Sequence, residues 1–250
     1  MPTHFQPSVL ITGASRGIGR ACALAFAQKG YALFLNYHSQ KSAAELLARA
    51  IESMYSVPAF PLQADVSCEN QVKAMVQEMA GRFGHIDVLV NNAGIAQQKL
   101  FTDITAEDWK RMFDVNIGGM FHCCKAVLPY MIHEKKGKII NISSIWGMVG
   151  ASCEVHYSAS KAAVLGFTKA LAKEEGLSGI QVNCVAPGVV GTEMNATLDE
   201  DTLASIREET PLNTIGTPED IARTVLFLAS KGADFITGQV ISPNGGFVIC

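Results

Sequence analysis

The sequence lacks the features that would mark a membrane, secreted or nucleic-acid-binding protein. Its 250 residues contain no run of 18 apolar residues, so we expect no transmembrane helix. The opening stretch MPTHFQPSVLITG has no charged segment followed by an apolar one, so we expect no signal peptide. The net charge is −3, which argues against nucleic acid, because that partner calls for a concentrated basic face.

The cysteines and histidines show no metal-binding or disulfide pattern. There are seven cysteines, an odd number, with no CxxC pair among them. Several lie in apolar stretches, where cysteine behaves as a small hydrophobic residue. The six histidines show no HExxH or similar spacing. We therefore expect reduced thiols, a cytoplasmic location and no metal site.

The sequence does contain a regular alternation of apolar segments and helical patterns. Seven segments predict buried parallel strands: 9–12, 31–36, 58–63, 87–92, 137–143, 180–187 and 238–243. Helical patterns occupy 16–30, 68–84, 106–131 and 157–175, and another follows Thr217. This order predicts an α/β Rossmann fold, a seven-stranded parallel sheet with helices on both faces. We find no linker or repeat and expect one domain over 1–250, with 188–216 as a lid or binding loop.

Four helix ends carry recognisable signals. Gly30 suits the position after a helix end, and Ser67 is the expected N-cap of the helix at 68–84. Thr105 is expected to cap the next helix, with Asp108 as its third residue. Thr217 precedes Pro218 and two acids, a typical helix start.

A glycine-rich turn, VLITGASRGIGRA, follows the first strand directly. Its spacing is G-x-x-x-G-x-G, and the helix that follows offers free N–H groups and the positive end of its dipole. Glycines there allow close approach of a diphosphate, although three glycines alone also fit a simple tight turn. The position after the first strand favours a nucleotide site. We expect contacts from Gly13, Ser15, Arg16, Gly17, Ile18 and Gly19.

The end of the second strand indicates which dinucleotide binds. An acidic residue there would hold the ribose 2′-hydroxyl of NAD, but Asn36 stands near that position and no acid appears before Glu45. Arg16, His38, Ser39 and Lys41 would attract a 2′-phosphate. We therefore favour NADP(H), with ordinary surface charges as the alternative for Arg16 and Lys41. Beyond the next strands, the expected cofactor contacts are Asp65, Val66, Asn92, Ala93 and Gly94.

The stretch HYSASK puts Tyr157 and Lys161 four residues apart on a predicted helix. Residues at this spacing share a helix face, and a neighbouring ammonium lowers the pKa of a phenol. Such a tyrosine exchanges a proton with an alcohol or ketone, and Ser144, at the end of the fifth strand, is placed to hold the substrate oxygen. The alternative is that Tyr157 packs in the core while Lys161 extends to solvent.

Four motifs together resemble the short-chain dehydrogenase/reductase family. They are TGxxxGxG, NNAG, Ser144 ahead of YxxxK, and PGVVGT at 187–192, in this order and each at a strand end. The resemblance implies hydride transfer with a nicotinamide cofactor and a catalytic tetrad of Asn116, Ser144, Tyr157 and Lys161. It also implies that Tyr157 and Lys161 contact the cofactor, and that Pro187, Gly188, Val190 and Thr192 surround its carboxamide. Our own reading of DVNIGG gives Asn116 only as a polar residue in a helix.

Within the family, the sequence is most similar to the bacterial 3-oxoacyl-acyl-carrier-protein reductases. SRGIGRA, DVLVNNAGI, ITGQV and NGGF carry this likeness. It implies docking of an acidic carrier protein, for which Lys135, Lys136 and Lys138 are candidates, although a solvated loop explains EKKGK equally well. It also implies a homotetramer formed through the helices at 105–131 and 157–175 and the C-terminal edge.

One stretch, SSIWGMVGASCEVHYS, is instead similar to bacterial reductases of a 5-aminopentanone group on elongation factor P. It adds Trp146, Cys153, Glu154 and Val155 as candidate substrate contacts. Glu154 would attract an amine and Trp146 a cation, unless Trp146 packs and Glu154 is solvated. A small-ketone, sugar or steroid dehydrogenase remains a third alternative. A nucleotide-binding regulator without turnover is a different class, which the complete tetrad disfavours.

Overall fold

The computed structural model describes residues 6–193 and 199–249, which form one seven-stranded parallel sheet. The strands are β1 (Ser8–Ile11), β2 (Ala32–Tyr37), β3 (Ala59–Gln63), β4 (Val88–Asn91), β5 (Gly137–Ile142), β6 (Ile180–Val185) and β7 (Val240–Ile241). Their order across the sheet is β3-β2-β1-β4-β5-β6-β7. Strands β2 and β3 lie on one side of β1, and β4 to β7 lie on the other side. Open α/β sheets bind ligands at such a reversal of strand order, here between β1 and β4. The predicted fold class is confirmed.

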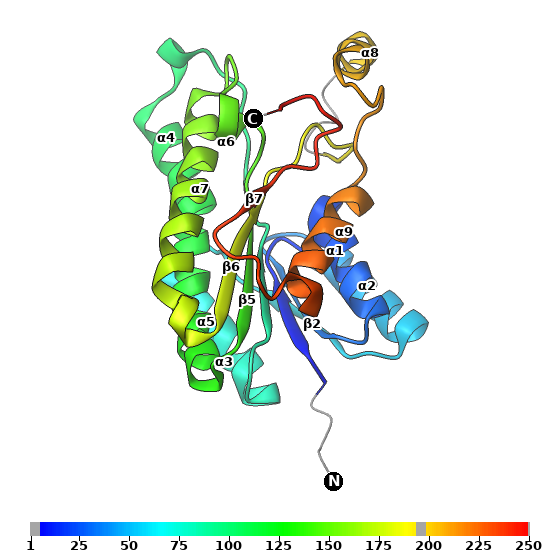
Figure 1. Cartoon of the computed structure of the whole chain (residues 1–250), viewed down its shortest axis with the longest axis vertical. Coiled ribbons are helices and arrows are strands. Elements are labelled where there is room, and N and C mark those ends of the chain that lie inside the picture. Colours follow the sequence, from blue (N-terminus) through cyan, green and yellow to red (C-terminus); the bar gives the residue numbers. More distant parts are fainter. Residues whose placement is uncertain (1–5, 194–198, 250) are drawn as a thin grey trace.

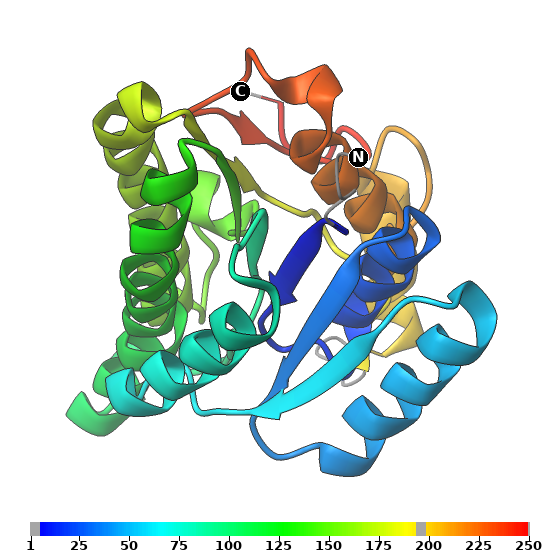
Figure 2. The same ribbon diagram turned by 90° about the horizontal axis from the view of Figure 1, so that it is seen from below.

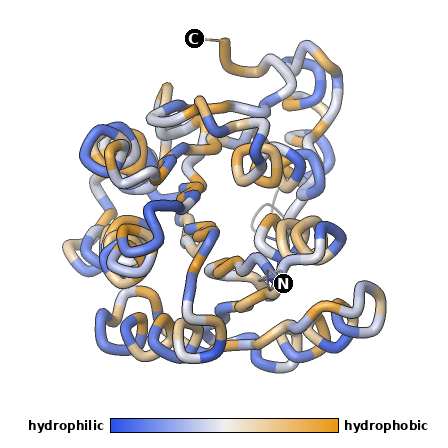
Figure 3. The backbone as a smooth tube through the Cα atoms, turned by 60° about the horizontal axis from the view of Figure 1, so that its bottom comes forward, coloured by the Kyte–Doolittle hydropathy of each residue, from blue (hydrophilic) through white to orange (hydrophobic). Residues whose placement is uncertain are grey.

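Helices cover both faces of this sheet (Figures 1 and 2). One face carries α1 (Gly17–Gln28), α2 (Lys41–Tyr55) and α9 (Pro218–Ala229), whose apolar residues pack on β1 and β2. The other carries α3 (Glu69–Phe83), α5 (Gly119–Glu134) and α7 (Val155–Glu175). Along these helices hydrophobic and hydrophilic positions alternate, as expected for helices with one buried side (Figure 3).

Two capping predictions are confirmed and one is wrong. Thr105 begins α4 (Ala106–Phe113) and Thr217 begins α9, each in a capping box with an aspartate. Helix α3 begins at Glu69 with Cys68 as N-cap, one residue later than predicted. The hydroxyl of Ser67 instead donates to Asp65 Oδ1 at 2.7 Å, because the nearby carboxylate is a strong acceptor.

Two helical regions differ from the predictions. The helix expected over 106–131 is divided by a π-helical turn, η2 (Asp114–Gly118). Helix α2 was not predicted, although Ala44, Leu47, Ala48 and Ile51 lie at helical spacing and are buried. Its N-terminus has no side-chain cap, so the strongest local signal of a helix start is absent.

The remaining helical segments complete the carboxyl edge of the sheet. Short α6 (Trp146–Val149) follows β5, and the polar insertion contains α8 (Glu200–Glu209). Part of that insertion, 194–198, lies outside the described residues. Three short turns are η1 (Phe101–Asp103), η3 (Gly176–Ser178) and η5 (Lys231–Ala233). Among the helices described, none has the length and apolar character needed to cross a bilayer.

Candidate active site

Two adjoining cavities lie at the carboxyl edge of the sheet. The glycine-loop cavity has a volume of about 540 Å³ and the tyrosine cavity about 370 Å³. They share five lining residues, Ile18, Asn92, Gly94, Ile95 and Thr192, and so form one continuous cleft. Each cavity has the volume of an ordinary ligand site, so the two together have room for a dinucleotide and a second molecule beside it.

The glycine-loop cavity is lined by a backbone turn at which a side chain would be strained or would clash. Gly13 and Gly17 have positive φ angles of 63° and 52°, a conformation that favours glycine. A Cβ on Gly19 would stand 2.4 Å from the carbonyl oxygen of Gly13. The loop then enters α1, whose N-cap Arg16 makes no side-chain cap, so N–H groups remain available to an anion. A dinucleotide diphosphate fits this cradle.

Asn36 holds the glycine loop in position. The N–H of Gly13 donates to its side-chain oxygen at 3.2 Å, and its amide nitrogen donates to the carbonyl of Ala64 at 3.0 Å. The side chain is buried and bridges the turn after β1 to the end of β3. Asn36 lines the cavity as predicted, but these bonds engage its amide with the backbone.

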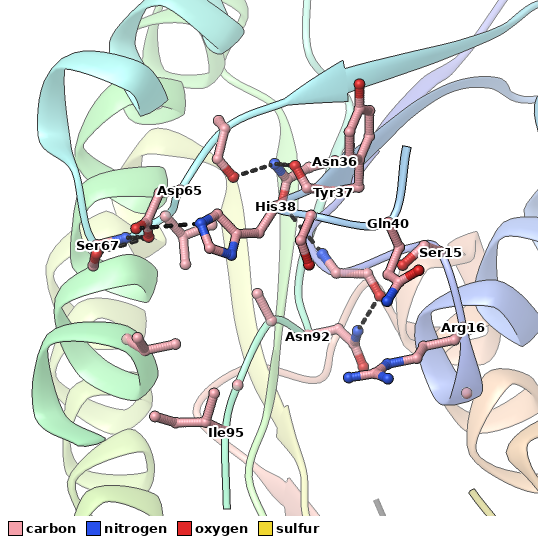
Figure 4. Close-up of a pocket in the computed structure, with 18 of the residues that line it drawn as sticks. Ser15, Arg16, Asn36, Tyr37, His38, Gln40, Asp65, Ser67, Asn92 and Ile95 are labelled. Atoms are coloured by element: carbon pink, nitrogen blue, oxygen red, sulfur yellow. Dashed lines mark hydrogen bonds and ion pairs between the residues drawn. The ribbon is translucent and has the colours of Figure 1, made fainter. Parts of the chain in front are cut away.

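Charged side chains of both signs line the outer part of this cavity, and Figure 4 shows Arg16, His38 and Asp65 among them. Arg16 and His38 line it as predicted, whereas Lys41 does not and instead pairs with Glu45 at 3.8 Å. Lys110 and Arg111 of α4 also line it. Sequence reasoning missed these two, because only the fold brings α4 across from the glycine loop. Four carboxylates, Asp65, Glu107, Asp114 and Glu193, line the same cavity, and Lys110 pairs with Asp114, so Arg16 and Arg111 are the cations most available to an additional phosphate.

Asp65 lies among these cations with its carboxylate already bonded. Its Oδ1 accepts from the N–H of Ser67 at 2.9 Å, and Oδ2 is 3.7 Å from His38 Nε2. Burial alone would raise the pKa of Asp65, but the Ser67 hydrogen bonds and the charges of His38 and Arg111 hold it below its usual value. Asp65 is therefore an ionised acceptor on the wall of the cavity, where a cofactor contact was expected.

Three of the predicted catalytic residues line the tyrosine cavity. Ser144 follows β5, and Tyr157 and Lys161 project from α7. The Ser144 side chain lies close enough to the Tyr157 hydroxyl to lower its pKa, and its oxygen accepts from the N–H of Trp146 at 3.2 Å. A serine hydroxyl and a phenol thus meet at one point, where both can contact a single substrate oxygen.

Asn116 reaches the same region from the π-helical turn. It is buried, its side-chain oxygen accepts from the N–H of Ile95 at 2.8 Å, and its amide donates to Ser160 of α7 at 3.0 Å. Gly94 lies between Asn116 and Lys161, since a Cβ there would be 3.2 Å and 3.4 Å from their polar atoms. The wider π turn changes the direction in which its side chains point, and this places Asn116 beside Ser144, Tyr157 and Lys161.

The predicted effect of Lys161 on Tyr157 is wrong for this structure. Burial raises the pKa of Tyr157 to about 12 and lowers that of Lys161 to about 8. The lysine nitrogen donates to the carbonyl of Ile142 at 3.0 Å and lies 5.7 Å from the centre of the Tyr157 ring. Removal from water is the largest cause of both shifts, and Lys161 is not among the groups that shift the pKa of Tyr157. Lys161 does not extend to solvent either, because only 5% of it is exposed.

The far wall of the tyrosine cavity contains two of the four candidate substrate contacts. Trp146 and Glu154 line it, whereas Cys153 and Val155 do not. The Trp146 ring packs edge-on against Phe247 at 5.9 Å. Burial raises the pKa of Glu154, and one of its oxygens accepts from Gln98 at 3.2 Å. Gln97 and Gln98 line the cavity as well and were not predicted from the sequence.

The segment that follows β6 closes the cleft on its other side. Pro187, Gly188 and Val190 line the tyrosine cavity, and Thr192 lines both cavities. A Cβ on Gly188 would stand 2.8 Å from Asn244, so glycine is required for this close packing. All four residues therefore lie where a nicotinamide carboxamide was expected.

The lysines suggested for carrier docking lie away from this chain's own cleft. Lys138 is the second residue of β5 and Ser144 stands two residues beyond its end, so the strand separates them by about 20 Å. Lys136 pairs with Asp87 at 2.9 Å and Lys138 with Asp234 at 2.7 Å. These lysines therefore do not line the cleft of the same chain, and their part in carrier docking stays a prediction.

Comparisons with known proteins agree with this geometry. A family model described as enoyl-(acyl carrier protein) reductase matches residues 13–248. A 3-oxoacyl-acyl-carrier-protein reductase of Staphylococcus epidermidis is 43% identical over 97% of this chain and 99% of its own. Its counterpart from Synechocystis is 42% identical over 96% of each chain. The crystal structure of such a reductase from Brucella melitensis superposes with a TM-score of 0.92, at 33% identity, covering 100% of this chain and 94% of that one.

Proposed function

This chain belongs to the short-chain dehydrogenase/reductase family, and on that premise we propose that it reduces a ketone to a secondary alcohol with NADPH. The favoured substrate is a 3-oxoacyl thioester on an acyl carrier protein, as the names of its relatives state for those proteins. The observation that carries the proposal is the meeting of Ser144, Tyr157, Lys161 and Asn116 beside the glycine-loop cavity.

The chain's own residues have defined parts in this reaction. Bound in the cleft, the nicotinamide cofactor supplies hydride to the ketone carbon. The Ser144 hydroxyl holds the ketone oxygen, and Tyr157 gives that oxygen its proton, which it retains at neutral pH because its pKa is about 12. Lys161 stands behind Tyr157 and binds the ribose, and Asn116 holds the π turn against Ile95.

The preference for NADPH over NADH rests on charge. Arg16, His38 and Arg111 line the outer cavity, and the end of β2, where an NAD-specific site has a carboxylate for the ribose hydroxyls, carries none. Asn36 stands at that point of β2 and is uncharged. We expect a lower KM for NADPH than for NADH, and Arg16→Ala to raise the KM for NADPH alone.

We further propose that the whole chain acts as one catalytic domain in a homotetramer. In an antiparallel pairing of α5 about a twofold axis, the end of one helix lies beside the start of the other. Since α5 is about 24 Å long, Lys135 and Lys136 would then lie near the cleft of the neighbouring copy. There they would attract an acidic carrier, and residues 188–216 would cover the bound substrate.

A second candidate substrate, an aminoketone such as the one attached to elongation factor P, is favoured by Glu154. This carboxyl group lines the tyrosine cavity half-buried, and no cation within the described residues forms an ion pair with it. A buried carboxylate is stabilised by a cationic partner, which a substrate ammonium would provide. Trp146 adds an aromatic wall to the same cavity.

One assay tests the reaction and separates the two substrates. Loss of NADPH absorbance is followed with a 3-oxoacyl thioester and with an aminoketone. Tyr157→Phe is expected to lower kcat by about 10²-fold or more while NADPH still binds. Glu154→Gln is expected to lower kcat/KM about tenfold for the aminoketone only, because a charge-assisted contact is lost. Undiminished turnover by Tyr157→Phe, or no turnover of any ketone by the unmodified protein, would refute the proposal.

A further inference from the structure

The Gln97 side chain connects α4 to α7, the helix that carries Tyr157 and Lys161, and so adds a second link to the direct bond from Asn116 to Ser160. Its oxygen meets Nε2 of His156 at 2.9 Å, and its amide nitrogen donates to Asp108 Oδ1 at 3.2 Å. His156 immediately precedes Tyr157 on α7. Asp108 lies in the first turn of α4, which continues into the π turn that holds Asn116. The Gln97 amide therefore links the helix that leads to Asn116 with the helix that carries Tyr157.

The direction of every hydrogen bond in this bridge is determined. Lys99 donates to Asp108 Oδ2 at 2.6 Å, and this bond, with that from the Thr105 N–H, holds the pKa of the carboxyl group far below its usual value. Asp108 therefore stays ionised and can only accept. The Gln97 nitrogen must face it, the Gln97 oxygen must face His156, and Nε2 of His156 must carry the proton.

His156 has no other polar contact to orient it. The ring is fully buried, and within the described part of the chain its Nδ1 has no hydrogen-bond partner. Buried polar atoms in proteins are nearly always bonded, and within the described residues the bond to Gln97 is the one hydrogen bond of this ring. Loss of that bond would leave both ring nitrogens unsatisfied one residue from Tyr157.

We propose that Gln97 is a positioning residue, which sets the placement of Asn116 relative to Tyr157 by joining α4 to α7. The inference rests on the proposed ketone reduction. Two neighbouring hydrogen bonds hold the segment that contains Gln97 in position. The N–H of Lys99 donates to the Cys153 carbonyl at 2.7 Å, and the Gln98 side chain donates to Glu154. Displacement of a catalytic group by a fraction of an ångström is enough to slow a reaction.

The test compares Gln97→Ala with a matched control, Gln6→Ala. Gln6 also bonds across two segments, to the Gly30 carbonyl at 3.0 Å, but at the opposite edge of the sheet. We expect Gln97→Ala to lower kcat about tenfold or more and to change the NADPH dissociation constant much less, because Gln97 does not line the glycine-loop cavity that holds most of the cofactor. Gln6→Ala is expected to keep the kcat of the unmodified protein.

His156 variants supply a second, conservative comparison. His156→Gln retains an amide donor toward Gln97 and is expected to keep more of kcat than His156→Phe. The double variant Gln97→Ala/His156→Phe should lose no more than the larger single loss, because both changes break one bond. A kcat for Gln97→Ala within twofold of normal, or fully additive losses in the double variant, would overturn the inference.

Hydrogen exchange separates this inference from the proposed function. Faster exchange of the amides at 155–161 in Gln97→Ala, but not in Gln6→Ala, is expected whether or not the assayed ketone is the natural substrate. Unaltered exchange there would count against Gln97. Absence of any ketone turnover in the unmodified protein would count against the proposed function instead.

Discussion

At the scale of single residues, the active site contains a buried lysine, Lys161, whose positive charge lowers the stability of the folded protein. Burial lowers the pKa of Lys161 from 10.5 to about 8, so at pH 7 the ionised side chain costs about 3 kcal/mol relative to the unfolded chain. The unfolded chain binds more protons between these two values, so stability rises as pH increases from about 8 to 10.5. The protein keeps a destabilising lysine where the chemistry needs one.

Replacement of this lysine is therefore expected to stabilise the protein while it destroys activity. Lys161→Met should raise the free energy of unfolding at pH 7 by about 1 to 3 kcal/mol, less than the full charge cost because the bond to Ile142 is lost. The gain should shrink as pH rises toward 10.5 and vanish above it, where lysine becomes neutral in both states. Urea unfolding at pH 7 and pH 10 measures both quantities, and a Met variant that is less stable at pH 7 would contradict this account.

At the scale of helices and strands, the sequence predicted what is set by local pattern. All seven strands were located from short apolar runs, and the capping boxes at Thr105 and Thr217 from residue spacing alone. The π turn was not predictable, because it depends on the bonds of Asn116 to Ile95 and Ser160, which are distant in sequence. Gln97 was missed for the same reason, since its partners lie on two other elements.

The two capping boxes offer a paired prediction at this scale. Thr105→Ala and Thr217→Ala each remove a bond to a backbone N–H, at 3.1 Å and 3.3 Å, and should each cost about 1 kcal/mol of stability. Only Thr105 begins the helix that leads to Asn116, so only Thr105→Ala should also lower kcat. Thermal unfolding with steady-state kinetics tests the pair. Equal activities in the two variants would show that the start of α4 has no influence on the site.

At the scale of the whole molecule, long-range effects decided where the sequence interpretation failed. Tyr157 and Lys161 were correctly assigned to one helix face, but their pKa values follow from the depth of burial, which spacing does not reveal. Lys135 and Lys138 were identified as a basic cluster, but the strand direction puts them at the edge opposite the cleft. Both outcomes depend on how distant elements pack around the sheet.

Two separate sets of exposed apolar side chains bear on the proposed tetramer. Trp109, Phe121 and Ile132 are each more than 40% exposed on α4 and α5, and Phe227, Phe235 and Ile249 are at least as exposed on α9 and near the C-terminus. Exposed apolar patches of this kind commonly mark interfaces between subunits. Two different twofold interfaces are what a tetramer built from two dimers requires.

Each interface can be broken separately. Phe121→Asp puts a charge into the α4–α5 surface and Phe235→Asp into the C-terminal surface, so each variant should run as a dimer and the combined variant as a monomer. Light scattering on a sizing column measures the mass. If Lys135 and Lys136 serve the neighbouring cleft across α5, Phe121→Asp should also raise the KM for a carrier-bound ketone, while Phe235→Asp should not. A single mass for all four proteins would exclude both surfaces as interfaces.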